Sequence, residues 1–181
     1  MAAVGAAALA WGVFVERNRF TVRHESVAVL EPGARPLTVL HLSDLHMAPW
    51  QQRKQEWVRS LALLEPDLIV NTGDNLGHVD GIEGLEKALQ VFAGIPGVFV
   101  HGSNDYVGPQ LKNPFTYFGG PSRTPTKPTS LDTARLERYF EDTLGWLSLN
   151  NTSRALEIKG SRLEVFGTND AHRNWDRLDV L

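Results

Sequence analysis

Apolar residues in the first part of the chain alternate between short continuous runs and helical stripes. The runs at 37–42, 68–71 and 98–101 are rich in Val, Ile and Leu, which predicts three buried strands. Apolar residues at helical spacing over 51–64 and 82–92 predict a helix between each pair of strands. Strands that alternate with helices build right-handed crossovers. We therefore predict an α/β fold, with a mainly parallel or mixed sheet flanked by helices.

Further elements are expected on either side of this alternation. The β-branched stretch 20–30 predicts an additional strand before the first run. A third helical stripe covers 136–144, and strands at 154–158 and 163–166 flank the turn Lys159-Gly160 as a hairpin. Between them, 107–130 is dense in Pro and Gly, and loops of that length are usually functional lids or disordered. We expect this loop to decide the choice of substrate.

The amino-terminal segment differs from the rest, because Ala2 to Val15 carries no charge. At about 1.5 Å per residue, a helix of this length is shorter than a hydrocarbon core of about 30 Å. Two interpretations stay open: a membrane anchor or interfacial helix, and an ordinary helix packed on the domain. Residues 1–19 are thus set apart from one domain over 20–181. Arg17, Arg19 and Arg23 follow the segment. If the segment inserts into a membrane, these positive charges would keep the domain on the cytoplasmic side. We therefore expect a membrane-associated or cytoplasmic protein.

Composition narrows the chemistry. The chain has 18 basic and 21 acidic residues, so it lacks the basic field of a nucleic-acid-binding protein, and we expect no nucleic-acid partner. It has no cysteine, which excludes disulfides, thiolate zinc sites and a cysteine nucleophile. Any metal site must therefore use oxygen and imidazole ligands.

Polar clusters at 43–46, 72–75 and 102–105 follow the three predicted strands. Ligands bind beyond the carboxyl ends of the strands in open α/β sheets, so the clusters should meet at one edge. Asp44 and His46 are two apart and would point to the same side if the chain stays extended. Asp74 follows Gly73 and has two carboxylate oxygens, with which it could bridge two cations. Such ligands suit Mn²⁺, Fe or Zn²⁺.

Three sequence blocks carry a family resemblance. Asp44-x-His46, Gly73-Asp74-Asn75 and Gly102-Ser103-Asn104-Asp105 follow one another at intervals of about thirty residues. In that order they resemble the D-x-H, G-D and G-N-H-[DE] blocks of the calcineurin-like metallophosphoesterases. The phrases LHLSDLH, PDLIVNTGDN and GVFVHGSNDY, with KNP and the late GTNDAH, further resemble a membrane-associated actinobacterial branch of this family.

The resemblance implies the amino-terminal part of a phosphoesterase sandwich that hydrolyses phosphate esters. Two divalent metal ions (Mn, Fe or Zn) and a metal-bound hydroxide would carry the reaction. Asp44 and His46 would bind the first ion, Asp74 would bridge both, and Asn104 would bind the second. Asp74 and Asn104 are then the catalytic candidates.

The chain departs from the family pattern at two places. An ungapped match puts Ser103 at the position of the ligand asparagine and Asn104 at that of the histidine, so either residue could be the ligand and the usual general acid is missing. The family's further histidine and its G-H-x-H block have no match after Asp105, so we expect a truncated chain with weak metal binding and little hydrolysis. A degenerate, noncatalytic metal- or phosphate-binding module is the alternative.

Simpler interpretations stay open for single residues. Asp44 and His46 could cap a turn, Asp74 could be a loop carboxylate, and Asn104 could belong to a turn. For four residues outside the blocks, a functional and a structural role both stay open: His78, His101, Asp170 and His172.

Overall fold

The computed structural model describes residues 2–108 and 129–181 of the chain. A sheet of four parallel strands lies at its centre, and Leu40 pairs with Ile69, which in turn pairs with Gly97. This arrangement confirms the predicted α/β fold with a parallel sheet. In spatial order, the strands are β1 (Val39–Leu42), β2 (Leu68–Asn71), β3 (Gly97–Phe99) and β4 (Leu147–Ser148).

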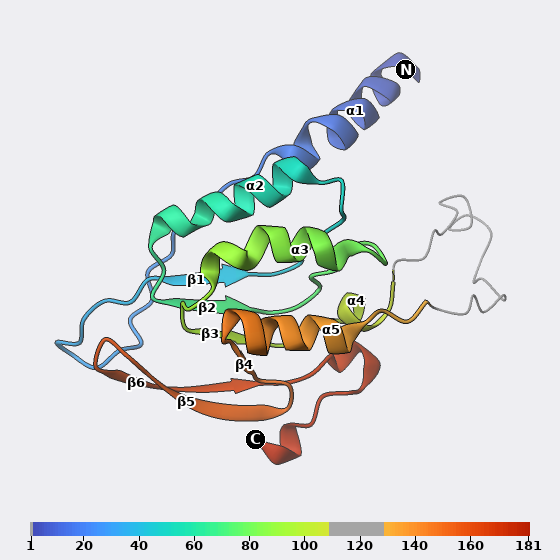
Figure 1. Ribbon diagram of the computed structural model, residues 1–181. Coiled ribbons are helices and arrows are strands. Elements are labelled where there is room, and N and C mark those ends of the chain that lie inside the picture. Colours follow the sequence, from blue (N-terminus) through green and yellow to red (C-terminus); the bar gives the residue numbers. More distant parts are fainter. Residues whose placement is uncertain (1, 109–128) are drawn as a thin grey trace.

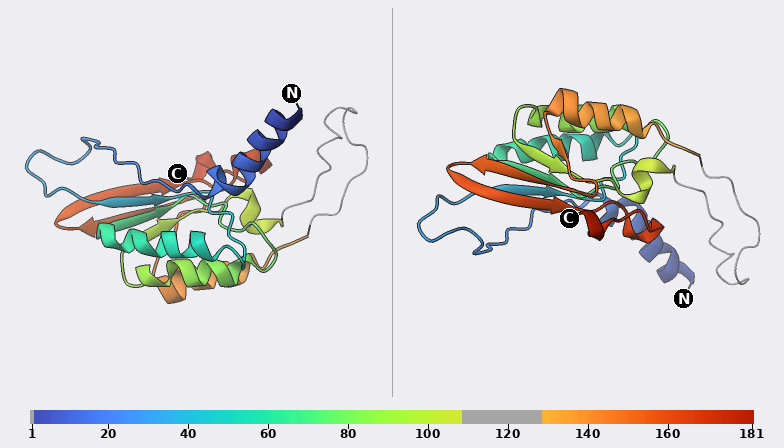
Figure 2. Two further views of the ribbon diagram at one scale, coloured as in Figure 1. Left: turned by 90° about the horizontal axis from the view of Figure 1, so that it is seen from above. Right: turned by 90° about the horizontal axis from the view of Figure 1, so that it is seen from below.

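Helices cover one face of this sheet (Figures 1 and 2). Each crossover between parallel strands brings its helix back over the same face, as right-handed connections do. The predicted stripes form these helices, each extended by a short helix of different pitch. They are α2 (Gln52–Ser60) with η2 (Leu61–Leu64), α3 (Gly81–Leu89) with η3 (Gln90–Phe92), and α5 (Thr133–Arg138) with the π-helical η5 (Tyr139–Leu144).

The predicted hairpin is present as an antiparallel pair of strands on the opposite side of the sheet from the helices (Figure 2). It pairs only with itself among the strands of the described residues. Short helices follow β3 and the hairpin. These elements are β5 (Thr152–Ile158), β6 (Ser161–Gly167), α4 (Ser103–Tyr106), η6 (Ala171–Arg173) and η7 (Leu178–Val180).

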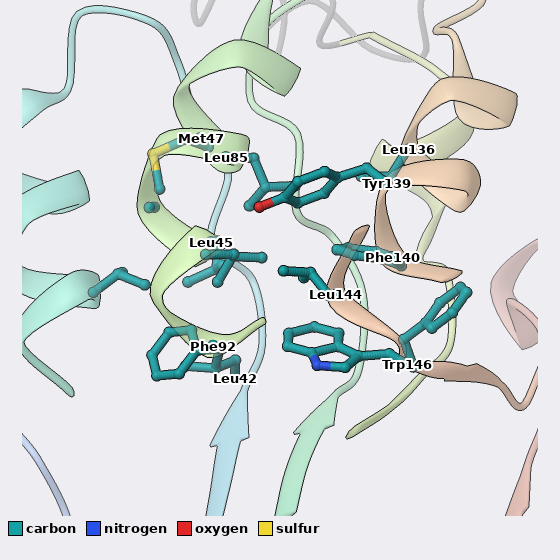
Figure 3. Packing of buried hydrophobic residues seen from close by; sticks show 14 of the residues in the cluster. Leu42, Leu45, Met47, Leu85, Phe92, Leu136, Tyr139, Phe140, Leu144 and Trp146 are labelled. Carbon is teal, nitrogen blue, oxygen red and sulfur yellow. The ribbon is translucent and has the colours of Figure 1, made fainter. Parts of the chain in front are cut away.

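The core lies between the sheet and the helix layer (Figure 3). Phe140 packs against Phe99 at 4.8 Å between ring centroids and stacks on Trp146 at 5.4 Å. The indole of Trp146 lies directly over Gly97, where an added Cβ would come within 2.5 Å of the ring. Aliphatic side chains complete the layer: Leu42, Leu45, Met47, Leu85, Leu136 and Leu144.

The prediction of a strand at 20–30 is wrong. Residues 20–29 have no regular secondary structure, and nearly all of them are exposed. Val27 and Val29 keep 75% and 77% of their surface in solvent. The β-branched composition is therefore not matched by burial, and burial against a partner is what stabilises a strand.

Ahead of that segment, α1 (Ala2–Phe14) and η1 (Glu16–Asn18) form the amino-terminal end. Helix α1 projects away from the domain in all three views (Figures 1 and 2). Among the described residues, no helix combines the length and the apolar character needed to cross a bilayer.

The ends of the predicted long loop are held together. The backbone N–H of Gly108 donates to the carbonyl of Thr129 at 2.8 Å, and Val107 and Ser130 form an antiparallel bridge. The rest of the loop, 109–128, lies outside the described residues, and with it the motif KNP and the expectation that this loop selects the substrate.

One ion pair joins the hairpin turn to the start of β2. The Lys159 ammonium lies 2.7 Å from the Asp67 carboxylate, which also accepts a 2.9 Å hydrogen bond from the backbone N–H of Thr38. The hydrogen bond from Lys159 is the main cause that lowers the pKa of Asp67 from its usual 3.8, and the Thr38 N–H adds to it. A carboxyl whose pKa is lowered by folding stabilises the fold above its unfolded pKa, and this contribution disappears as pH falls through the folded pKa.

We therefore expect Lys159→Met to reduce the free energy of unfolding by about 0.5–1 kcal/mol at neutral pH. The difference from the unchanged chain should vanish at pH values where Asp67 is protonated in both. Urea denaturation at a series of pH values measures this. Arg162→Met is the matched control, because Arg162 and its partner Glu164 are exposed to 75% and 63%, and a difference as large for it would contradict a specific role of the Lys159 pair.

Candidate metal centre

Three of the predicted ligands lie together at the carboxyl edge of the sheet. Asp44, His46 and Asp74 each offer one ligand atom, and these atoms all lie within 4.8 Å of one another. Nε2 of His46 is 3.7 Å from Asp44 Oδ1 and 4.0 Å from Asp74 Oδ2. The side chains are exposed to 67% for Asp44, 44% for His46 and 24% for Asp74, so an ion from solvent can reach all three. Their convergence confirms that the polar clusters after β1 and β2 meet at one edge of the sheet.

The backbone reaches this arrangement by a route that the sequence pattern did not indicate. Asp44 and His46 were expected to share a side because the chain stays extended, but both have left-handed φ angles, 53° and 40°. Asp74 is left-handed as well, at 54°. Non-glycine residues adopt this conformation rarely, and its strain tends to be found at functional sites. Between Asp44 and His46, Leu45 is buried in the core.

Hydrogen bonds join the loop after β1 to the loop after β2. The N–H of Asp44 donates to the carbonyl of Gly73 at 3.0 Å, and the N–H of His46 donates to the carbonyl of Asp74 at 3.0 Å. One residue further, Met47 donates to Asn75 at 2.7 Å. The pairing of the two strands thus continues past their ends, and it fixes the relative positions of the three side chains.

The third block contributes Asn104 to this cluster. In α4, the backbone N–H of Asn104 donates to Asp74 Oδ1 at 2.9 Å, and its side-chain amide donates to Asp74 Oδ2 at 2.8 Å. Both oxygens of Asp74 are therefore oriented by one residue. Each oxygen keeps a lone pair for a cation.

Comparison with known proteins decides the family. A model of the calcineurin-like phosphoesterases matches residues 37–180, which is most of the chain. The chain belongs to this family. No curated protein matches it significantly.

Membership of the calcineurin-like phosphoesterases implies metal-dependent hydrolysis of phosphate esters. The donor set of two carboxylates and one imidazole fits that chemistry, because hard oxygen and nitrogen ligands suit the divalent ions of hydrolases. The matched region begins just before β1 and so includes every block of the cluster.

Behind the cluster lies a buried polar network that sequence reasoning missed. Asp105 is fully buried, and its carboxylate accepts from the backbone N–H of Asn75 at 2.8 Å, the side chain of Asn75 at 3.2 Å and the N–H of Gly102 at 3.1 Å. Asn75 also pairs with Asn71 through two side-chain hydrogen bonds, at 2.8 and 3.1 Å. The available signal was Asn71 itself, a polar residue that ends an apolar strand and must find partners when buried.

Two glycines let the loops of this family member approach closely. A Cβ on Gly73, whose φ is 89°, would lie 2.2 Å from the backbone nitrogen of Gly102. A Cβ on Gly102 would lie 2.2 Å from Asp74 Oδ1. The loops after β2 and β3 are therefore in direct contact, and only glycine fits at either position.

The histidines and the aspartate outside the blocks have contacts of their own. His101 is buried, and its Nδ1 is 3.8 Å from Asp105 Oδ2, which places it in the structure behind the site. His78 contacts the edge of the Trp50 ring, at 4.8 Å between centroids. Asp170 accepts a hydrogen bond from the N–H of His172 at 2.9 Å, as the cap of η6.

The loop that contains Asp170 touches α4. The hydroxyl of Tyr106 hydrogen-bonds the side chain of Asn169 at 3.0–3.2 Å, and Tyr106 packs edge-on against Trp175. Burial raises the pKa of Tyr106 above its usual 10.0, so the phenol stays neutral. This contact joins α4 to the loop after β6.

Proposed function

We propose that this chain is a phosphoesterase in which Asp44, His46, Asp74 and Asn104 hold two divalent metal ions, with Mn, Fe or Zn as the metal. The observation that carries this is the convergence of three ligand atoms within 4.8 Å at the carboxyl edge of a parallel sheet. Ligands in α/β folds bind at this edge. The substrate is a phosphate ester.

Each residue has a distinct part in this proposal. Asp44 and His46 hold the first ion, Asp74 bridges the two, and Asn104 contributes its carbonyl oxygen to the second. Asn104 is preferred to Ser103 because its amide reaches Asp74 at 2.8 Å. When bound, the two ions lower the pKa of water and offset charge on the phosphoryl oxygens.

The cluster's own side chains limit the proton chemistry. Asn104 can donate a hydrogen bond to a phosphoryl oxygen but cannot supply a proton to a leaving group. His46 is the one imidazole of the three-residue cluster, and its role as a ligand requires the neutral form. The leaving group must therefore be stabilised without a general acid from these four residues.

A second candidate function is a noncatalytic module that binds a metal ion or a phosphate. Its support is that the chain has the amide of Asn104 where the family pattern has a histidine. In either case, we propose that residues 20–181 form the phosphoesterase domain and that 1–19 is a separate segment. The likeness to an actinobacterial branch remains part of the proposal.

Metal binding tests the site directly. We expect isothermal titration with Mn²⁺ to show binding by the unchanged chain and at least about tenfold weaker binding by Asp74→Asn, since the substitution removes the bridging carboxylate. Asp80→Asn is the matched control, because Asp80 is 70% exposed and is not one of the three clustered residues. Equal Mn²⁺ affinity in all three proteins would overturn the proposed centre.

Hydrolysis separates the two candidates. Turnover of bis-p-nitrophenyl phosphate that requires Mn²⁺ and is lost in Asp74→Asn would establish the phosphoesterase. It would also contradict the expectation that this chain hydrolyses little substrate. Mn²⁺ binding with no turnover of mono- or diesters would favour the noncatalytic module.

A further inference from the structure

The apolar side chains of helix α1 that the structure describes are exposed. Val4, Leu9 and Trp11 keep 73%, 69% and 55% of their surface in solvent, and the helix projects from the domain (Figure 1). Its sequence, AAVGAAALAWGVF, has no polar or charged side chain on any face. A helix that packs on its own domain has one apolar stripe, whereas a helix that is apolar all round requires an apolar environment on every side.

Basic residues lie at the point where α1 joins the domain. Arg19 and Arg23 are exposed and follow η1, with Arg17 between them and the helix in the sequence. Arg53, also exposed, lines one surface hollow together with Asn18 and Trp50. Glu16 and Glu25 are the acidic residues of the segment 16–25, so its three arginines exceed its acidic charge. An apolar helix with cations at its base matches the layering of an anionic bilayer, in which phosphates surround the hydrocarbon.

We propose that α1 inserts into an anionic lipid bilayer as an anchor, with the arginines at its base among the lipid phosphates. The thirteen residues span about 20 Å as a helix, which reaches well into a hydrocarbon core of about 30 Å. Trp11 lies near the end of α1 that joins the domain, at the depth where tryptophan is enriched in membrane proteins.

The anchor joins the domain beside the carboxyl edge of the sheet. Trp50 shares the surface hollow with Asn18 and contacts His78, whose neighbour Gly77 packs against the backbone carbonyl of His46. In Figure 1 the base of α1 and the ends of β1 and β2 lie at the same side of the molecule, and the hairpin turn lies at the other. Insertion of α1 therefore brings the candidate metal centre, and not the hairpin turn, toward the lipid phosphates.

Vesicle flotation tests the anchor independently of any activity. We expect the full chain to float with vesicles of phosphatidylcholine and phosphatidylglycerol in equal amounts, and Leu9→Glu/Trp11→Glu to lose at least about tenfold in binding, because two carboxylates oppose insertion. The matched control is Val27→Glu/Val29→Glu, which adds the same charges at exposed apolar positions outside α1. Its binding should equal that of the unchanged chain. Added salt should weaken the binding without abolishing it, since it screens only the arginines.

Single-cysteine labelling tests the orientation, because the chain has no cysteine of its own. An environment-sensitive fluorophore at Leu9→Cys should become more fluorescent with vesicles, one at Arg53→Cys should be quenched by headgroup-labelled lipid, and one at Arg162→Cys in β6 should change little. Failure of the unchanged chain to float, or equal loss in both double variants, would overturn the anchor. A third result would also overturn the anchor: a chain that does not bind vesicles but self-associates through α1. Sedimentation would show this self-association, and Leu9→Glu/Trp11→Glu would remove it.

Discussion

Replacing Gly102 with alanine is expected to displace Asp74 and to cost the chain both cation affinity and stability. The new Cβ would lie 2.2 Å from Asp74 Oδ1 and 2.7 Å from the Asp74 backbone nitrogen. The backbone itself is no obstacle, because Gly102 has φ −98° and ψ 176°, which alanine adopts freely. The effect therefore arises from contact alone, and the carboxylate that links the two loops has to move.

Two measurements follow for Gly102→Ala. Urea denaturation should show a loss of about 1–3 kcal/mol, the usual cost of an added carbon in a packed region. Titration with Mn²⁺ should show at least about tenfold weaker binding, since displaced ligands lose affinity to this extent. Gly108→Ala is the control, because a Cβ there meets its nearest neighbours at 3.4–3.5 Å. Unchanged Mn²⁺ affinity in Gly102→Ala would show that the contact does not position Asp74.

Replacing Asp105 with asparagine is expected to destabilise the chain by about 2–4 kcal/mol, because each buried group left without a partner costs about 1–3 kcal/mol. The carboxylate of Asp105 accepts three hydrogen bonds in a fully buried position. An amide of the same shape has only one oxygen and turns an N–H₂ group toward those donors. Because the side-chain shape is conserved, the loss in the free energy of unfolding measures the contribution of the carboxylate as a hydrogen-bond acceptor.

The comparison for Asp105→Asn is Asp142→Asn, the same change on an exposed residue of η5. Thermal and urea unfolding should leave Asp142→Asn within about 0.5 kcal/mol of the unchanged chain, as is usual for surface substitutions. If both variants lost the same small amount, the buried network would not contribute to stability as proposed. If the folded Asp105→Asn variant also lost Mn²⁺ binding, the buried network around Asp105 would be shown to hold the cluster of Asp44, His46 and Asp74 in place.

The central fold could be predicted because its signals are local. The apolar residues 68–70 and the buried Asn71 form β2 at the expected bounds, since a fully buried strand shows in the sequence as an apolar run. The prediction at 20–30 failed because β-branched composition does not reveal whether a partner strand is present. Strand β4 was missed because Leu147 and Ser148 are too few residues to form a pattern, and their place beside β3 is set by tertiary contacts.

The sequence predicted which residues form the candidate site but not the backbone geometry that brings them together. The polar clusters after three apolar strands indicated Asp44, His46 and Asp74, because parallel strands present their carboxyl ends at one edge. The left-handed backbone at these residues was not foreseeable, since aspartate and histidine adopt it only where neighbours enforce it. The role of Asp105 was hidden for a related reason, because its hydrogen-bond partners in the loop after β2 are thirty residues away.

The pairing that continues past β1 and β2 has a consequence for how an ion enters. The amides of Asp44, His46 and Met47 are already bonded across the two loops, so these loops need not fold around an incoming cation. At the proposed metal centre, ion capture would then depend on how quickly the cation releases its hydration water, a property in which Mg²⁺ is slow. Discrimination between metals can thus be kinetic as well as geometric at this edge.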